Sequence, residues 1–116
     1  MQKTNNRLEQ LFQYLETNPN DSFARFCIAQ EYVKEGKIDK AKGYFRVLKQ
    51  HDPAYIGTYY HLGKLFEEEG DDDQAAQVYQ EGITMANKNG DQHALNELKQ
   101  AMELLTGGDD EFEEEV

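Results

Sequence analysis

An all-α fold of about six antiparallel helices is what the sequence predicts. The chain has 116 residues, which is enough for one small domain with one core. It holds two prolines, and it lacks the long runs of valine, isoleucine and threonine that favour strands. Apolar residues recur instead at three- and four-residue intervals, the period of a helix with one buried face.

The first predicted helix covers about residues 7–18. Its apolar stripe, at positions i, i+3, i+4 and i+7, consists of Leu8, Leu11, Phe12 and Leu15. Asn18 ends this helix, because a residue that precedes a proline is disfavoured in the α region.

The next two predicted helices form a pair within residues 22–55. Asp21 or Ser22 can cap the first of them, and Gly36 ends it, since glycine readily adopts a left-handed conformation. The second helix closes at Asp52, again before a proline. The residues predicted to be buried are Ile28, Ala29 and Tyr32 in the first helix, and Ala41, Phe45 and Leu48 in the second.

A second pair follows at about residues 55–89. Its first helix is predicted from about Tyr55 to Glu69, and Asp71 can cap the second, with Gln74 placed as in a capping box. The buried set is Tyr59, Leu62, Gly63, Phe66, Ala75 and Tyr79. Gly82 lies inside the second helix at a cost of about 1 kcal/mol relative to alanine. It either makes room for a sixth helix or is a tolerated weak position.

The sixth helix is predicted at about 91–105, with Leu95, Leu98, Met102 and Leu105 in register. Residues 107–116 then carry six acidic side chains and no basic one, so they supply −6 of the formal charge of −11. This segment has too little apolar surface to fold. The sequence therefore predicts one domain over residues 1–106 and a disordered acidic tail over 107–116.

Charge and composition exclude several classes of function. The acidic balance would repel a nucleic-acid backbone, and the bases between Lys34 and Lys49 lie among acids on an expected solvated surface. The chain has a single cysteine, Cys27, so no disulfide can form within it. We see neither a signal peptide nor an apolar run of about 18–20 residues that could span a bilayer. We expect a cytoplasmic protein that binds neither nucleic acid nor membranes.

A shift of 34 residues aligns the two predicted helix pairs. The aligned positions are Ile28 with Leu62, Ala29 with Gly63, Tyr32 with Phe66, Gly36 with Gly70, Ala41 with Ala75, and Phe45 with Tyr79. The order of large, small and aromatic residues is therefore kept between the two copies. A helix–turn–helix unit that repeats in this way indicates a solenoid.

The pattern resembles the tetratricopeptide repeat (TPR) family. The second copy reads Tyr59-x2-Leu62-Gly63-x2-Phe66 followed by Ala75-x3-Tyr79. Departures from the family pattern are Arg25, where the first copy should carry a large aromatic residue, and Asn87, where the second should carry a proline. The resemblance implies a right-handed α-α superhelix with repeat copies at about 22–55 and 56–89, flanked by the helices at 7–18 and 91–105.

The resemblance also implies a concave groove, lined by the first helix of each pair, that holds a peptide or helix of a partner protein. A helical wheel independently separates a set of residues from the packing positions. These candidate groove residues are Phe23, Phe26, Gln30, Val33, Gly57, Tyr60, His61, Lys64 and Glu67. An alternative is that Phe23 and Phe26 pack under the N-terminal helix and that Tyr60 meets the C-terminal one.

One TPR subclass clamps the terminal carboxylate of chaperones, but only Lys64 supplies a cation at the corresponding positions, so this ligand is not expected. The chain's own end, Glu113-Glu114-Glu115-Val116, superficially resembles such a ligand, although a solvated tail is the favoured interpretation.

No catalytic, cofactor or metal site is predicted. The three histidines, His51, His61 and His93, are too far apart in sequence for a zinc site, and Cys27 is best explained as a small packing residue. The expected function is a non-catalytic protein-interaction module, either a monomer or a weak homodimer. The alternative is a self-associating structural protein whose open repeat edge, at Arg25 or the sixth helix, forms a homodimer.

Overall fold

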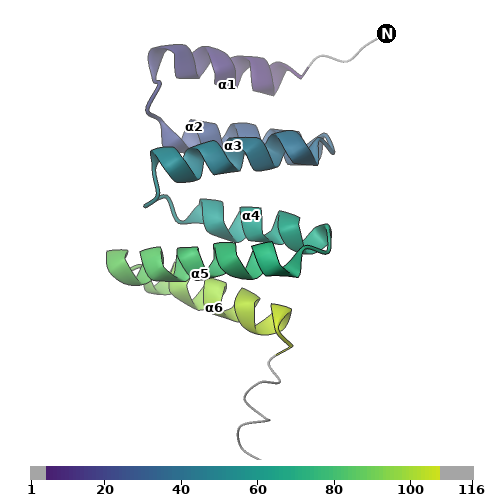
Figure 1. Cartoon of the computed structure of the whole chain (residues 1–116). Helices are drawn as coiled ribbons and strands as arrows, with labels where there is room; N and C mark the ends of the chain where they lie inside the picture. Colours follow the sequence, from purple (N-terminus) through teal and green to yellow (C-terminus); the bar gives the residue numbers. More distant parts are fainter. Residues whose placement is uncertain (1–4, 108–116) are drawn as a thin grey trace, which may run out of the picture. The chain divides into compact units, whose positions relative to one another are not determined.

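A computed structural model describes residues 5–107 of the chain, and this part contains α-helices and no strand (Figure 1). The helices are α1 (Asn6–Thr17), α2 (Ser22–Lys34), α3 (Ile38–His51), α4 (Gly57–Glu68), α5 (Asp72–Asn89) and α6 (Gln92–Leu105). The predicted all-α class with six helices is thus confirmed. Apart from Gly107, the predicted acidic tail lies outside the described residues.

The helices form two compact units, Met1–Tyr55 with α1 to α3 and Ile56–Val116 with α4 to α6. The division between them falls at the boundary that the 34-residue period places between the two repeat copies. We call them the N-terminal and C-terminal units and treat each by itself.

The N-terminal unit is built on the pair α2 and α3, with α1 packed against α2. Asp21 caps α2 by accepting a hydrogen bond from the backbone N–H of Ala24 (3.0 Å), and Gly36 follows the helix with a φ of 76°. Its buried apolar residues are Leu8, Ala24, Cys27, Ile28, Ala29, Tyr32, Ala41, Phe45 and Leu48. Of the stripe predicted for α1, only Leu8 is fully buried.

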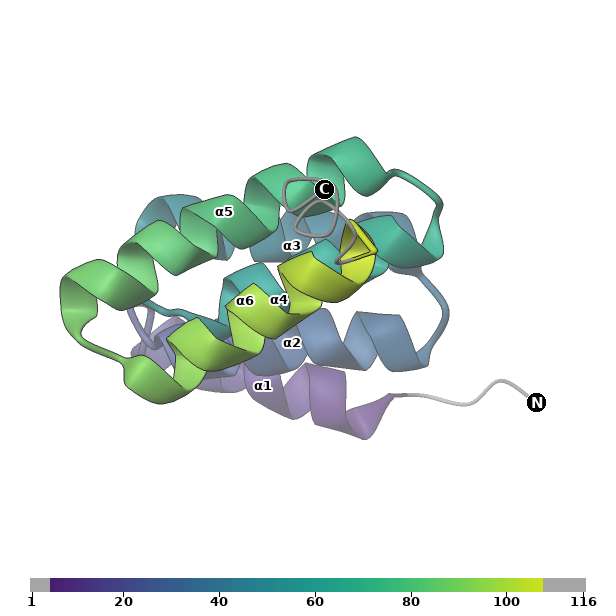
Figure 2. The same ribbon diagram turned by 90° about the horizontal axis from the view of Figure 1, so that it is seen from below.

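The C-terminal unit contains α4 paired with α5, and α6 packs against both (Figure 2). Asp71 accepts a hydrogen bond from the backbone N–H of Gln74 (3.2 Å), as the predicted cap requires. The helix α4 begins at Gly57, two residues later than expected. Tyr55 instead lies outside the helix, and its ring is 5.6 Å from that of Phe26.

The buried face of α6 differs from the predicted stripe. Leu95, Leu98 and Ala101 are buried, whereas Met102 and Leu105 are only partly covered. Leu95, Leu98 and Ala101 are each three residues apart, whereas the predicted stripe also contained an interval of four. A stripe with intervals of three alone turns around the helix axis, away from the predicted one. The small Ala101, which the sequence did not predict to be buried, is therefore the packing residue in place of Met102.

Among the helices of residues 5–107, none combines the length and the apolar character needed to cross a membrane. The same residues contain no cluster of three or more histidine, cysteine, aspartate or glutamate side chains arranged to hold a metal ion.

Candidate functional site

Six of the nine predicted groove residues line two cavities, one in each unit. Four of them, Phe23, Phe26, Gln30 and Val33, line a cavity of about 370 Å³ in the N-terminal unit. Two others, Tyr60 and Lys64, line a cavity of about 230 Å³ in the C-terminal unit. Neither cavity is lined by the remaining three, which are Gly57, His61 and Glu67.

We call the cavity of the N-terminal unit the α1/α2 cavity. Aromatic side chains line one side of it, and charged side chains line the other. Its lining consists of Arg7, Phe23, Phe26, Cys27, Gln30, Glu31, Val33 and Lys34. Phe23 is 63% exposed, so the N-terminal helix does not cover it. Phe26 is half-buried, with its ring 5.8 Å from that of Phe45. Phe23 is therefore available for contact, whereas Phe26 is partly buried in the core.

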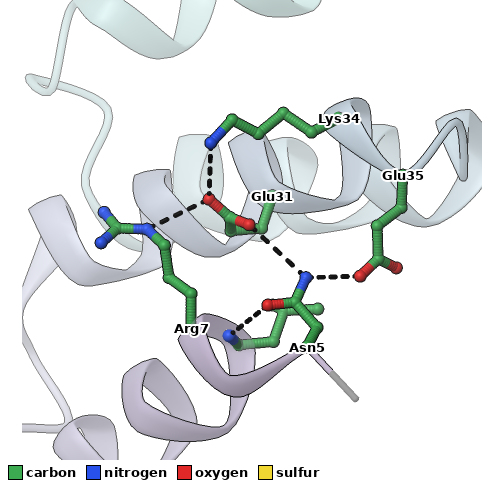
Figure 3. A network of polar contacts seen from close by, with 6 residues as sticks. Asn5, Arg7, Glu31, Lys34 and Glu35 are labelled. Carbon is green, nitrogen blue, oxygen red and sulfur yellow. Dashed lines mark hydrogen bonds and ion pairs between the residues drawn. The ribbon is translucent and has the colours of Figure 1, made fainter. Parts of the chain in front are cut away.

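A carboxylate network forms the charged side of this cavity (Figure 3). Glu31 is buried, and one of its oxygens lies 3.1 Å from Arg7 Nε on α1 and 3.1 Å from Lys34 Nζ on α2. Asn5 caps α1 through its side-chain oxygen and donates hydrogen bonds to Glu31 and Glu35. The network thus fixes the start of α1 to the end of α2.

Sequence reasoning missed this network. Glu31 and Lys34 are three residues apart on one helix, a spacing at which opposite charges pair. The contacts of Arg7 and Asn5 join residues more than 20 positions apart, and local spacing carries no sign of them. The buried position of Glu31 could not be recognised either, because a glutamate in a helix is usually exposed.

The pKa of Glu31 is lowered in the folded chain. Burial acts in the opposite direction and is the largest single influence, but it is outweighed by hydrogen bonds from Lys34 and Asn5 and by the charges of Lys34 and Arg7. A carboxyl group with a lowered pKa stabilises the fold above its ordinary pKa, and this stabilisation is lost as the pH falls through the lower folded value.

We therefore expect Glu31→Gln to lower the free energy of unfolding by about 1 kcal/mol at neutral pH, since the partners Arg7 and Lys34 are largely exposed. The difference from the wild type should shrink as the pH falls through the folded pKa of Glu31. Urea unfolding at pH 7 and pH 3 measures both effects. Equal differences at the two pH values would contradict the assigned role of the ionised carboxylate.

The cavity of the C-terminal unit, here the α4/α6 cavity, is lined by Tyr60, Lys64, Glu97, Gln100, Ala101 and Leu104. Tyr60 thus does meet the C-terminal helix, but at the wall of an open cavity. Lys64 Nζ lies 5.5 Å from the centre of the Tyr60 ring, within the range of a cation–π contact. Leu104 is 71% exposed. Apolar, aromatic and charged groups therefore meet on one accessible surface.

None of the four α6 residues that line this cavity was predicted. The sequence indicated the sixth helix as a possible open repeat edge, but it assigned none of the residues of this helix to the groove. The available signal was Leu104, a large apolar residue outside the predicted stripe of this helix.

Glu67 and His61 interact with other residues of the C-terminal unit. The hydroxyl of the buried Tyr79 donates a hydrogen bond to Glu67, whose carboxylate is also 3.8 Å from Lys64 Nζ. This bond, together with burial as the larger cause, raises the pKa of Tyr79. Burial lowers the pKa of His61, against a smaller opposing effect of Glu97. Glu67 therefore orients Tyr79 and Lys64.

Comparisons with known proteins find similarity to tetratricopeptide repeat proteins. A family model described as tetratricopeptide repeat matches residues 56–89. A TPR repeat-containing protein of Pseudomonas aeruginosa is 26% identical over 91 residues, covering 78% of this chain and 87% of that protein.

Two solved structures are also similar. The solution structure of a tetratricopeptide repeat domain protein from Salinibacter ruber matches with a TM-score of 0.74 and 42% identity, over 77% of this chain and 90% of that one. The solution structure of a protein from Bordetella parapertussis matches with a TM-score of 0.74 and 28% identity, over 94% of this chain and 92% of that one.

Proposed function

Because this chain belongs to the tetratricopeptide repeat family, whose members are typically protein-interaction modules, we propose that it binds a peptide or helix of a partner protein. Each unit offers its own candidate surface, formed by the predicted groove residues on α2 in the N-terminal unit and by those on α4 in the C-terminal unit. The observation that carries this proposal is the α4/α6 cavity, where Tyr60 and Lys64 line an open surface beside the exposed Leu104. Aromatic and apolar side chains on accessible surfaces typically supply the binding energy of protein interfaces.

The chemistry of the two cavities supports recognition and offers no reaction. Each combines large apolar side chains with a few charged and amide groups, which is the composition of a protein-binding surface. The proposal is accordingly a non-catalytic module, and we further propose the cytoplasm as its compartment. The competing proposal is self-association through α6, for which the exposed Leu104 is an available contact. Light scattering over a range of concentrations distinguishes the two, since a constant monomer mass excludes self-association.

We expect the double variant Tyr60→Ala, Lys64→Gln to reduce capture of the partner at least about tenfold, the loss expected for one anchoring aromatic and its neighbouring cation. The measurement is affinity capture from the source organism with the wild-type chain as bait, mass spectrometry, and binding of the recovered partner to each variant. Glutamine at position 64 avoids placing a like charge beside Glu67.

The matched control is Tyr14→Ala with Lys88→Gln, which removes one tyrosine and one lysine outside both cavities. The control should bind as the wild type does, and the melting temperatures of both variants should remain close to that of the wild type. Undiminished capture by the Tyr60 and Lys64 variant would show that the α4/α6 cavity is not the binding surface.

A further inference from the structure

The α1/α2 cavity lies in the less acidic of the two units. Residues 5–55 contain eight basic and seven acidic side chains, a net charge of +1, whereas residues 56–107 contain three basic and ten acidic ones, a net charge of −7. The charges that line the α1/α2 cavity, on Arg7, Glu31 and Lys34, also sum to +1. The α4/α6 cavity is lined by one lysine and one glutamate within a strongly acidic unit. An acidic ligand is therefore favoured at the α1/α2 cavity.

Both cations of the α1/α2 cavity keep hydrogen-bond donors for a ligand. The side chains of Arg7 and Lys34 are 58% and 71% exposed. Arg7 contacts Glu31 through Nε, and Figure 3 shows its two terminal nitrogens directed away from that carboxylate. A guanidinium group that presents two such nitrogens can donate to a second carboxylate. The ammonium group of Lys34 has three donors, and Glu31 takes one of them.

Gln30 adds an amide group to the lining of this cavity. It lies four residues after Phe26 and four residues before Lys34, so the three side chains share one face of α2. Within residues 5–107, the side chain of Gln30 makes neither a hydrogen bond nor an ion pair. A side-chain amide both donates and accepts, so it can pair with the backbone of a bound peptide.

The aromatic side of the α1/α2 cavity provides the apolar part of the recognition. Phe23 is mostly exposed, and Phe26 is half-buried three residues further along α2. The cavity volume of about 370 Å³ lies within the usual range of ligand pockets, about 300–1000 Å³. An aromatic ring placed beside Phe23 would bury apolar surface on both rings. A fitting ligand is therefore a peptide segment in which an aromatic side chain has acidic neighbours.

We propose that the α1/α2 cavity binds an internal acidic segment of a partner protein, in which carboxylates flank an aromatic side chain. The aromatic ring contacts Phe23, the carboxylates pair with Arg7 and Lys34, and Gln30 bonds to the backbone of the segment. No free chain end is required, which distinguishes this ligand from the terminal carboxylate that one TPR subclass clamps. The inference rests on the proposed function, because it names the class of peptide that one of the two candidate surfaces accepts.

The probe is a synthetic peptide, Gly-Glu-Glu-Phe-Glu-Glu-Gly, with its amino end acetylated and its carboxyl end amidated. It is titrated into the full chain and followed by amide shifts in NMR spectra. We expect shifts at Phe23, Gln30 and Lys34, and none at Tyr60 or Leu104. A peptide with lysine in place of every glutamate, or with serine in place of phenylalanine, should bind at least about tenfold more weakly. Raising the salt concentration to about 1 M should also weaken binding.

Two matched pairs of variants test the contacts within the cavity. Phe23→Ser should lower the affinity for the acidic peptide at least about tenfold, whereas Val47→Ser, an exposed position outside the cavity, should leave it unchanged. Lys34→Gln should lower it about threefold. Lys37→Gln removes the same charge from the same unit, and Lys37 also pairs with a glutamate, but it lies outside the lining. This control should bind nearly as well as the wild type.

Four results would overturn the inference. They are the absence of shifts around the α1/α2 cavity, equal binding of the lysine peptide, an unchanged affinity of the Phe23→Ser variant, and tighter binding of a single-stranded thymidine oligonucleotide than of the acidic peptide. The last would assign the cavity to nucleic acid, which the net charge of −11 disfavours.

Failure of the inference can be told apart from failure of the proposed function. Capture of a partner through Tyr60 and Lys64, without binding of the acidic peptide, retains the proposed function and removes the inference. Binding of the acidic peptide at Phe23 and Lys34, without capture of any partner, does the reverse.

Discussion

Replacing Gly63 by leucine is expected to lower the melting temperature by at least about 12 °C, from a loss of about 3 kcal/mol or more. A Cβ atom at this position would lie 2.3 Å from Cε1, 2.7 Å from Cδ1 and 2.8 Å from Cζ of Tyr79. The Tyr79 ring is fully buried, and its hydroxyl is held by Glu67. It cannot move aside without losing this partly buried hydrogen bond. Circular dichroism during heating measures the effect.

The equivalent pair in the first repeat copy suggests how to test this explanation. There, Ala29 and Phe45 stand where the second copy has Gly63 and Tyr79, and both are fully buried. An alanine is thus accommodated where the aromatic residue lacks a hydroxyl. We expect Gly63→Ala alone to cost about 1–3 kcal/mol. Combined with Tyr79→Phe, it should cost less than the two single changes together, because the freed ring can shift.

The double-mutant cycle tests whether the cost of Gly63→Ala comes from the clash with the Tyr79 ring. A coupling energy of about 0.5 kcal/mol or more in favour of the double variant is expected for residues in contact. Strict additivity would mean that the position rejects alanine for a reason other than the Tyr79 ring, and the close-crossing explanation would be wrong.

The fold was largely predictable because its determinants are local. Gly63, Ala75 and Tyr79 differ in size in an order that helix crossings require, and this order repeats after 34 residues. Caps such as Asp71 act on N–H groups three residues away. A short window of sequence contains both kinds of information, so the helices and the pairing of α2 with α3 and α4 with α5 followed from the sequence.

The candidate site was predictable only where it continues the repeat. Phe23, Phe26, Tyr60 and Lys64 were found because they lie on helices whose packing face was already assigned. Arg7 and all of the cavity residues on α6 were missed, since their roles depend on which flanking helix covers which face. The same reason explains the register of α6, where Ala101 replaces Met102 as a packing residue. Local spacing does not determine which face of a flanking helix is covered.

The second prediction with a large effect concerns Gly82. Replacing it by alanine should destabilise the fold, although alanine has the higher helix propensity. In the middle of a helix, replacing glycine by alanine normally stabilises by about 1 kcal/mol. A Cβ on Gly82 would lie 2.5 Å from Cβ of Tyr59 and 3.0 Å from Cδ1 of Leu98. The Cβ of Tyr59 is fixed to its backbone and cannot rotate away. Gly82 therefore makes room for α4 even more than for α6, and it is no tolerated weak position.

We expect Gly82→Ala to lower the free energy of unfolding by about 1–2 kcal/mol, since overpacking exceeds the gain in propensity. The matched control is Gly43→Ala on α3, where a Cβ would meet no atom within 4 Å. That change should raise the free energy of unfolding by up to about 1 kcal/mol. Urea unfolding of the two variants thus gives changes of opposite sign, although the substitution is the same. If both variants were stabilised, α4 and α6 would not approach α5 as closely as the distances at Gly82 require.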